Sequence, residues 1–330
     1  MEQETILLNK PKVELRIAQK LFLEKQKIKV GSITLRTAQV NLNNKLDKLI
    51  AESKKETFKG IFIFPTGLGK SFGSFSHALR FVKDYEKRTG KKGKILVLVH
   101  TEPIMKQHKK DFKKLCNKSI GFMYKSKKEP DSDIIIGCVR TMKNYLNKFK
   151  PDRFVYIIVD ETQHATAKTW KINLDYFKPL VLLGMTATPN RTDEKDILPI
   201  YDNNKILEYT EEYCFKKKWL RPYNLLTLWD PHCDYGDING YYDSKKHIFM
   251  YNMRKVGKKY LVPERIEGII RDFKNGIDIP LKRPNGEEFY FKGIEDRQGI
   301  YFLPRIEAVK KYCEEFNKAG IKSAYILGKT

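Results

Sequence analysis

Short apolar runs alternate with segments of helical periodicity between residues 35 and 189. The runs have the length and composition of β-strands, and they cover residues 60–64, 95–99, 134–139, 156–159 and 180–185. Strands that alternate with helices are typical of a parallel sheet with helices on both faces. We therefore expect an α/β domain over residues 35–192, with ligands bound just beyond the carboxyl ends of its strands.

The pattern before this domain is different. Between residues 12 and 29, apolar residues recur at helical spacing among charged ones, at Leu15, Ala18, Leu21 and Phe22. This spacing predicts a short amphipathic basic helix. We interpret residues 1–34 as a small accessory element.

The pattern after residue 192 is less regular and richer in aromatic residues. We interpret residues 193–298 as a linker or insertion, in which Asn285-Gly286 predicts a hairpin turn. Three further patterns then predict a strand, a helix and a strand, at residues 299–303, 305–318 and 320–327. Residues 299–330 therefore look like the start of a second α/β domain, and the sequence ends before a second sheet is complete.

The chain is strongly basic. Its 330 residues include 64 Lys and Arg against 40 Asp and Glu, which gives a net charge of +24 and a pI of about 9.6. This balance favours a polyanionic partner, above all nucleic acid. The alternative is an ordinary solvated basic surface, since Lys, Ile and Asn are all frequent, as an AT-rich genome would produce.

Membrane and secretory functions are not indicated. No stretch approaches the roughly 20 apolar residues of a membrane span, and the first residues lack the basic and apolar regions of a signal peptide. The 5 cysteines are scattered and form no C-x-x-C pair, so neither a disulfide framework nor a zinc site is predicted. We expect a soluble, intracellular and cytoplasmic protein, with a nuclear or viral compartment as alternatives.

A phosphate-binding loop follows the first strong strand, and a helical pattern follows the loop. The candidate nucleotide-binding residues are Thr66, Gly67, Leu68, Gly69, Lys70 and Ser71. The two glycines let the backbone curl so that its N–H groups face phosphates, Lys70 adds a positive charge, and Ser71 can ligate Mg²⁺. The strict G-x-x-x-x-G-K-[ST] pattern has glycine where this chain has Phe64. A glycine-rich turn with an incidental lysine is the alternative.

Two carboxylates end the strand at 156–159. Asp160 can hold Mg²⁺ opposite Ser71, and Glu161 can accept the proton of an attacking water. His164 lies close enough in sequence to couple this region to a neighbouring part of the protein. By itself, a histidine in this place is more often a local hydrogen-bonding residue.

Two further segments carry polar side chains that are candidate functional residues. Thr186 and Thr188 leave the end of the strand at 180–185, and their hydroxyls can bridge the carboxylate loop to a neighbouring segment. Upstream, Gln39 offers an amide that can pair with both a donor and an acceptor on an adenine edge. An exposed glutamine at a helix start is the alternative.

Together these residues resemble superfamily 2 DExH helicases, most closely the group of type III restriction helicase subunits and XPB-like translocases. The resemblance covers residues 35–330 in the family's order. Arg36 and Gln39 match its Q motif, residues 65–71 motif I, and 160–164 motif II. Motif Ia corresponds to residues 97–101 with Gln107, motif III to 183–191, and the opening of motif IV to 300–303. Cys138 departs from the family, which commonly has a hydroxyl residue there.

The resemblance implies an ATP-dependent motor built on RecA-like domains, with ATP and Mg²⁺ as cofactors. Nucleic-acid contacts and coupling are implied for His100, Thr101, Thr141, Thr186 and Thr188. Such contacts go to the phosphate backbone and are largely independent of sequence. DNA is favoured over RNA, which stays an alternative.

Three rival functions remain open from the sequence. The chain can be the motor subunit of a restriction or defence complex whose nuclease lies elsewhere, or a nucleic-acid-binding module without ATP turnover. A small-molecule kinase is the third, although it would not explain motifs Ia, III and IV. The family completes its ATP site with motifs V and VI, which lie beyond residue 330. We therefore expect these residues alone to bind ATP weakly and to show little stimulated hydrolysis.

Overall fold

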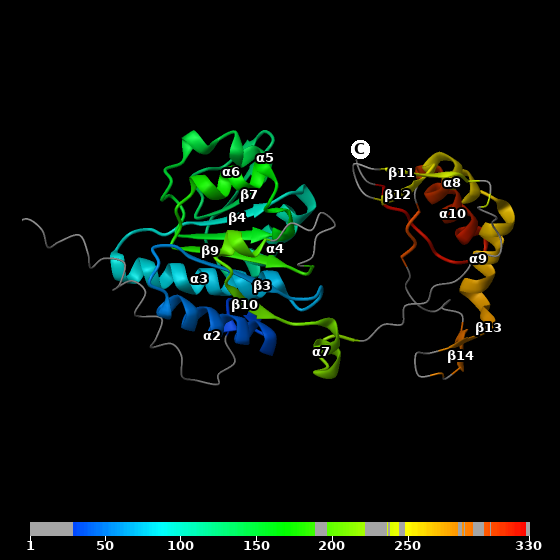
Figure 1. Cartoon of the computed structure of the whole chain (residues 1–330), viewed down its shortest axis with the longest axis horizontal. Coiled ribbons are helices and arrows are strands. Elements are labelled where there is room, and N and C mark those ends of the chain that lie inside the picture. Colours follow the sequence, from blue (N-terminus) through cyan, green and yellow to red (C-terminus); the bar gives the residue numbers. More distant parts are fainter. Residues whose placement is uncertain are drawn as a thin grey trace, which may run out of the picture. The chain divides into compact units, whose positions relative to one another are not determined.

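A computed structural model describes residues 29–188, 197–221, 236, 238–243, 248–282, 286, 288–292, 300–303 and 305–327. The chain divides into two compact units, Met1–Tyr223 and Asn224–Thr330 (Figure 1). The basic helix expected between residues 12 and 29 falls almost entirely outside the described residues. No helix in the described ranges is long and apolar enough to cross a membrane.

The first unit is built on one large sheet. Its eight strands lie in the order β10-β3-β9-β8-β4-β7-β5-β6. All neighbouring strands run parallel except β5 and β6. The strand bounds are β3 Phe58–Ile63, β4 Ile95–Val99, β5 Ile120–Tyr124, β6 Lys127–Lys128, β7 Ile134–Cys138, β8 Tyr156–Asp160, β9 Val181–Thr186 and β10 Lys205–Glu208. Each of the five predicted apolar runs forms one of these strands, so the predicted α/β class is confirmed.

Helices cover both faces of the sheet, as Figure 1 shows for α2 and α3 on one side and α5 and α6 on the other. The first face carries α2 (Thr37–Glu52), α3 (Lys70–Thr89) and α4 (Glu102–Leu115), and the second carries α5 (Val139–Lys143) and α6 (Lys168–Tyr176). Neighbouring residues of one strand, such as Val97 and Leu98, belong to different cores. The strands are therefore buried on both sides, which explains their unbroken apolar runs.

A buried polar cluster fixes α2 against α3 and β8. His77 Nδ1 pairs with the Tyr156 hydroxyl at 2.8 Å, and its Nε2 pairs with Asp47 Oδ1 at 3.1 Å. Arg80 donates to the other Asp47 oxygen at 2.8 Å. Burial lowers the pKa of His77 below its ordinary value. Burial acts to raise the pKa of Asp47, but hydrogen bonds and charges from His77 and Arg80 bring it below its ordinary value.

The first unit continues beyond residue 192, where the sequence placed a domain boundary. The short helix η4 (Leu198–Tyr201) packs in the second core, β10 pairs with β3, and α7 (Glu211–Lys216) follows. A Cβ atom built at Gly67 would meet Leu220 Cδ2 at 3.3 Å, so the segment after α7 returns to the phosphate-binding loop. A small antiparallel pair, β1 (Lys29–Val30) with β2 (Ile33–Thr34), precedes α2.

The second unit is smaller, and its described residues form two antiparallel strand pairs. They are β11 (Gly240–Asp243) with β12 (Ile248–Tyr251), and β13 (Gly276–Lys282) with β14 (Glu288–Lys292). The hairpin turn predicted at Asn285-Gly286 lies largely outside the described residues, but the strands on either side of it, β13 and β14, pair antiparallel. The helices are α8 (Met253–Lys259), α9 (Pro263–Asn275) and α10 (Ile306–Lys318), and Ile266 of α9 packs with Tyr312 and Phe316 of α10.

Two strands expected in the second unit are absent from the described residues. The segments 300–303 and 321–327 have no strand pairing, whereas the helix expected between them is present as α10. Ile300, Phe302 and Ile326 are 83%, 88% and 96% exposed. An apolar segment becomes a strand only when a neighbouring strand pairs with its backbone, and no such pairing exists among the described residues.

We expect Gly184→Ala to destabilise the first unit by about 1–3 kcal/mol, the usual cost of overpacking a core. A Cβ atom at this position in β9 would lie 2.5 Å from the ring of Tyr201. That ring is fully buried, and its hydroxyl bonds Thr162, so it cannot swing away. Thermal unfolding of the full chain measures the loss.

Gly137→Ala in β7 is the matched control, because it adds the same methyl group to the same sheet. Its Cβ would meet Met142 Cγ at 2.6 Å. Methionine is unbranched and adapts its shape readily, so a smaller loss is expected. Equal losses for the two variants would contradict the role given to the rigid Tyr201 ring.

Candidate nucleotide-binding site

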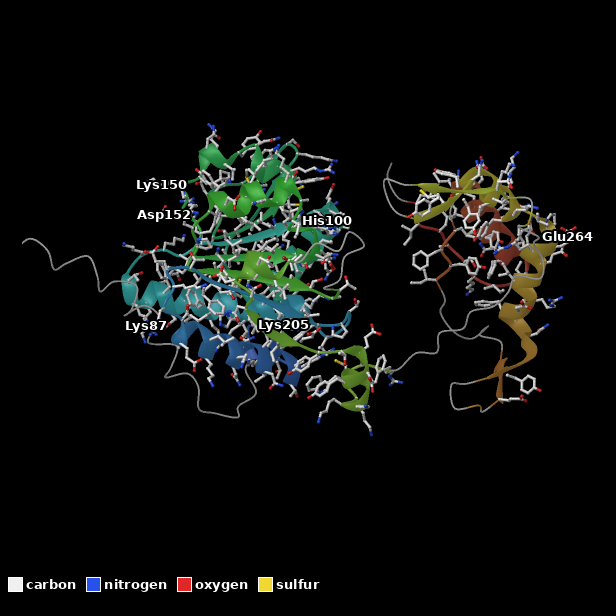
Figure 2. The ribbon with its side chains drawn as sticks, viewed as in Figure 1. Lys87, His100, Lys150, Asp152, Lys205 and Glu264 are labelled. Atoms are coloured by element: carbon white, nitrogen blue, oxygen red, sulfur yellow. The ribbon has the colours of Figure 1, made fainter. Side chains whose placement is uncertain are left out.

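The loops that carry the predicted motifs meet at the carboxyl edge of the sheet. In the sheet order, β9 lies between β3 and β8, with Ile63 opposite Thr186 and Asp160 opposite Met185. The Phe64 N–H donates to the Thr186 carbonyl at 3.0 Å. Figure 2 shows His100 at this edge, at the opposite end of the strands from Lys150 and Asp152, which precede β8. Motifs I, II and III are thus adjacent.

The phosphate-binding loop has the backbone that its glycines allow. Gly67 and Gly69 have φ angles of +88° and +83°, in the left-handed region that side chains disfavour. Gly69 is the N-cap of α3, so the helix starts directly after the loop. Thr66 and Gly67 are exposed, while Leu68 is buried beneath them and anchors the loop in the core. The loop therefore presents backbone and the positive end of a helix to a ligand.

Lys70 points back into the loop. Its ammonium group donates to the Phe64 carbonyl at 3.2 Å. Burial lowers the pKa of Lys70 below its ordinary value, although the charges of Glu161 and Asp160 act in the opposite direction. The positive charge of motif I therefore lies close to the two carboxylates of motif II. Ser71, the predicted metal ligand, is half-buried in the first turn of α3.

The amide of Gln39 is engaged inside the protein and is not presented to solvent. Gln39 is 3% exposed, and its Nε2 donates to the Gly69 carbonyl at 3.1 Å. Its Oε1 accepts from the Arg36 backbone N–H at 2.8 Å, which caps α2. Arg36 in turn donates from Nη1 to the Gly67 carbonyl at 3.4 Å. In this structure the Q-motif residues hold the phosphate loop, and the expected adenine contact would require Gln39 to exchange these bonds.

Asp160 and Glu161 stand at the end of β8 in different environments. Asp160 is 6% exposed, and both of its carboxylate oxygens accept hydrogen bonds. Glu161 is partly exposed and has φ +49° and ψ +50°, a left-handed conformation that costs a non-glycine residue roughly 1–2 kcal/mol. Such strain is typical of functional sites, because the surrounding structure must hold the side chain in place.

Gln163, which the sequence analysis did not select, joins motif II to motif III. Its Nε2 donates to Glu161 Oε2 at 2.7 Å, and its Oε1 accepts from the Thr186 hydroxyl at 2.7 Å. The Thr188 backbone N–H donates to the same Thr186 hydroxyl oxygen at 3.1 Å. Counting from Asp160, the D-E-x-H spacing falls on Gln163, and His164 stands one residue later. The bridging expected of His164 and the two threonines is therefore shared by Gln163.

The residues expected to face nucleic acid lie along the same edge. The rings of His100 and His164 have centroids 5.4 Å apart, and both residues are exposed. Thr101 is the N-cap of α4, so His100 and Thr101 lead from β4 into that helix. Thr141 is half-buried within α5, and Thr188 is exposed beyond β9. The structure thus places the His164 ring beside that of His100.

The residues present fit a magnesium-bound nucleotide. The loop supplies backbone donors and a lysine for phosphates, and Ser71 and Asp160 supply hydroxyl and carboxylate oxygens, which Mg²⁺ prefers. Mg²⁺ sites of this kind take one or two protein ligands together with the substrate's phosphates. Glu161 adds an acceptor beside them. The expected cofactors therefore match the chemistry of this edge.

Comparison with known proteins agrees with this geometry. Residues 32–191 match the family described as Type III restriction enzyme, res subunit. Protein IRC3 of Saccharomyces cerevisiae, named as an ATP-dependent helicase, is 28% identical over 170 residues, which cover 47% of this chain and 24% of IRC3. The type I restriction enzyme EcoAI endonuclease subunit of Escherichia coli is 24% identical over 251 residues, which cover 68% of this chain and 28% of that subunit.

A solved structure with a similar chain is the UvsW helicase from Bacteriophage T4. It is 17% identical with a TM-score of 0.42, and the match covers 58% of this chain and 66% of UvsW. The chain spans less than a third of the length of IRC3 and of the EcoAI subunit. The matched segment 32–191 contains the residues assigned to the Q motif and to motifs I, Ia, II and III, whereas the opening of motif IV at 300–303 lies outside it. Residues 32–191 are thus similar to the type III restriction enzyme res subunit family, in agreement with the resemblance that the motifs indicate.

Proposed function

We propose that the chain is the ATP-hydrolysing part of a motor that moves along nucleic acid, with DNA favoured over RNA. The observation that carries this proposal is the meeting of Lys70, Asp160 and Glu161 at one sheet edge, with Gln163 linking Glu161 to Thr186. A binding module without turnover would not need a carboxylate held in a strained conformation beside a phosphate loop. A small-molecule kinase would not need the link to motif III.

Each residue has a distinct role in the proposed hydrolysis. The loop backbone and Lys70 hold the β and γ phosphates and stabilise the charge that develops there. Ser71 and Asp160 hold Mg²⁺, which supplies charge compensation when bound. Glu161 orients the attacking water and accepts its proton. Through its hydrogen bonds, Gln163 transmits a change in the position or charge of Glu161 to Thr186, and so to the segment that follows β9.

The nucleic-acid strand is proposed to lie along His100, Thr101 and Thr141. These residues sit at the carboxyl edge or in the helices that leave it, and Thr101 stands at the N-terminus of α4, the positive end of the helix dipole. Contacts of this kind position a strand without reading its bases. The names of IRC3 and the EcoAI subunit support a nucleic-acid substrate, and the latter favours DNA.

The similarity to the EcoAI endonuclease subunit favours a second candidate function. In that case the chain would be the motor of a restriction complex, and the nuclease would lie on another segment or another chain. Both functions use the same ATP site, but a restriction motor tracks along duplex DNA. Stimulation of hydrolysis by covalently closed duplex circles, which have no single-stranded ends, would favour the restriction motor.

We expect the chain to bind single-stranded DNA, duplex DNA and RNA with little sequence preference and with strong dependence on salt. Each neutralised phosphate contributes about −0.7 to −0.9 to the slope of log affinity against log salt concentration. Fluorescence anisotropy at several salt concentrations gives the slope, and an ATPase assay with each nucleic acid gives the preferred substrate. Binding that is insensitive to salt and selective for one sequence would contradict the proposal.

A further inference from the structure

His108 makes a contact that none of the motifs predicts. It lies on the buried face of α4 and is 3% exposed. Its Nε2 lies 2.7 Å from Asp160 Oδ2, although 52 positions separate the two residues in sequence. The chain therefore places a histidine of the helix after motif Ia directly on the proposed Mg²⁺ carboxylate of motif II.

The direction of this hydrogen bond follows from its chemistry. An ionised carboxylate only accepts, so the Nε2 atom of His108 carries the hydrogen. The Glu161 backbone N–H donates to the other oxygen, Asp160 Oδ1, at 2.9 Å. Both oxygens are thus held from different directions, which fixes the rotation of the carboxylate about its bond to the chain. Carboxylates that bind metal ions are commonly oriented by such outer hydrogen bonds.

The surroundings of His108 show that its N–H group, rather than its bulk, matters at this place. The ring lies edge-on to Phe75, with centroids 5.0 Å apart, and Phe75 stacks on Phe112 at 3.9 Å. The other ring nitrogen, Nδ1, is buried without a hydrogen-bond partner among the described residues. An unpaired buried polar atom is unfavourable, so an apolar side chain would pack here at lower cost. The contact with Asp160 is the compensating interaction.

We propose that His108 is a positioning residue that holds the Asp160 carboxylate in the orientation Mg²⁺ requires. It also ties this carboxylate to α4, whose first turn carries the nucleic-acid contacts proposed above. His108 lies about two turns, roughly 10 Å, along the helix from Thr101. The proposal rests on the proposed ATPase function, because Asp160 needs a fixed orientation only if it binds a metal ion.

The test compares variants of the full chain by the Mg²⁺ dependence of nucleotide binding. His108→Phe keeps a ring but removes the donor, whereas His108→Gln keeps an N–H close to the place of Nε2. A fluorescent ATP analogue reports binding as Mg²⁺ is titrated. We expect His108→Phe to raise the Mg²⁺ concentration for half-maximal binding about 10- to 100-fold, the usual effect of losing an outer partner of a metal ligand. His108→Gln should restore most of this loss, and nucleotide binding without Mg²⁺ should stay unchanged in both variants.

Phe112→Leu is the matched control, because Phe112 is buried on the same face of α4 and belongs to the same aromatic stack. We expect it to lower the melting temperature and to leave the Mg²⁺ dependence as in the unchanged protein. His108→Leu serves as the second donor-free variant if His108→Phe does not fold. An unchanged Mg²⁺ dependence in the donor-free variant, failure of His108→Gln to restore it, or an equal shift in Phe112→Leu would overturn the proposal. If the unchanged protein itself bound no nucleotide with Mg²⁺, the proposed function would fail first, which is a different result.

Discussion

Replacement of Lys70 by alanine is expected to lower ATP turnover by roughly 10²- to 10³-fold or more, the range found when one charge-stabilising donor is removed from an active site. The Lys70 ammonium is held 3.2 Å from the Phe64 carbonyl, so it is already placed at the phosphate loop. Its charge interacts with both Asp160 and Glu161. Removing it leaves two carboxylates facing the triphosphate without compensation, and nucleotide affinity should fall together with turnover.

Lys83→Ala is the control for this prediction. Lys83 lies on the same helix, α3, and is exposed, so the substitution removes the same charge without touching the loop. Because these residues alone are expected to hydrolyse ATP slowly, turnover is followed by phosphate release at high protein concentration over long incubations, and binding by a fluorescent ATP analogue. A Lys70→Ala protein that folds and retains the turnover of the unchanged chain would exclude this loop as the ATP site.

The sheet could be predicted because each of its buried strands corresponds to a continuous apolar run in the sequence. Strands buried on both faces must be apolar throughout, and the run 95–99 coincides with β4. The loop at residues 65–71 could be predicted for a similar reason, since Gly67 and Gly69 are needed for left-handed backbone. In both cases the constraint acts on consecutive residues, so the pattern is visible without any knowledge of the rest of the chain.

The partners of the site residues could not be predicted in the same way. The contact between His108 and Asp160 depends on how α4 packs on the sheet, and nothing near either residue indicates it. The hydrogen bond from the Gln39 amide to the Gly69 carbonyl likewise depends on how the phosphate loop curls toward α2. These interactions form only when distant segments meet, so they leave no periodic signal in the sequence.

The contacts of His164 could not be predicted from the sequence for a different reason. The sequence places a polar residue at each of positions 162, 163 and 164 and does not say which one turns back to the carboxylate. The single 3₁₀ turn η3 (Thr162–His164) decides it, because it directs Gln163 to Glu161 and Thr186 while His164 packs beside His100. One residue of shift in a turn this short changes which side chain reaches the site.

Glu161→Gln is expected to leave nucleotide and Mg²⁺ bound while lowering turnover about 10²- to 10⁴-fold, the range for loss of a general base. The substitution keeps the shape of the side chain. The amide oxygen can still accept the hydrogen bond that Gln163 Nε2 makes to Glu161 Oε2 at 2.7 Å, so the link to Thr186 should persist. Only the ability to accept a proton from water is removed.

The neighbouring Asp160→Asn variant makes the same chemical change one residue earlier and should behave in the opposite way. Asp160 is proposed to hold Mg²⁺, and its oxygens already accept from His108 and the Glu161 backbone. An amide there supplies a weaker metal ligand, so Mg²⁺-dependent nucleotide affinity should fall, whereas Glu161→Gln should retain it. Retention is measured with a fluorescent ATP analogue under conditions in which the unchanged protein turns over. If Glu161→Gln lost affinity as severely as Lys70→Ala, the separation of metal binding from proton transfer between these two carboxylates would be wrong.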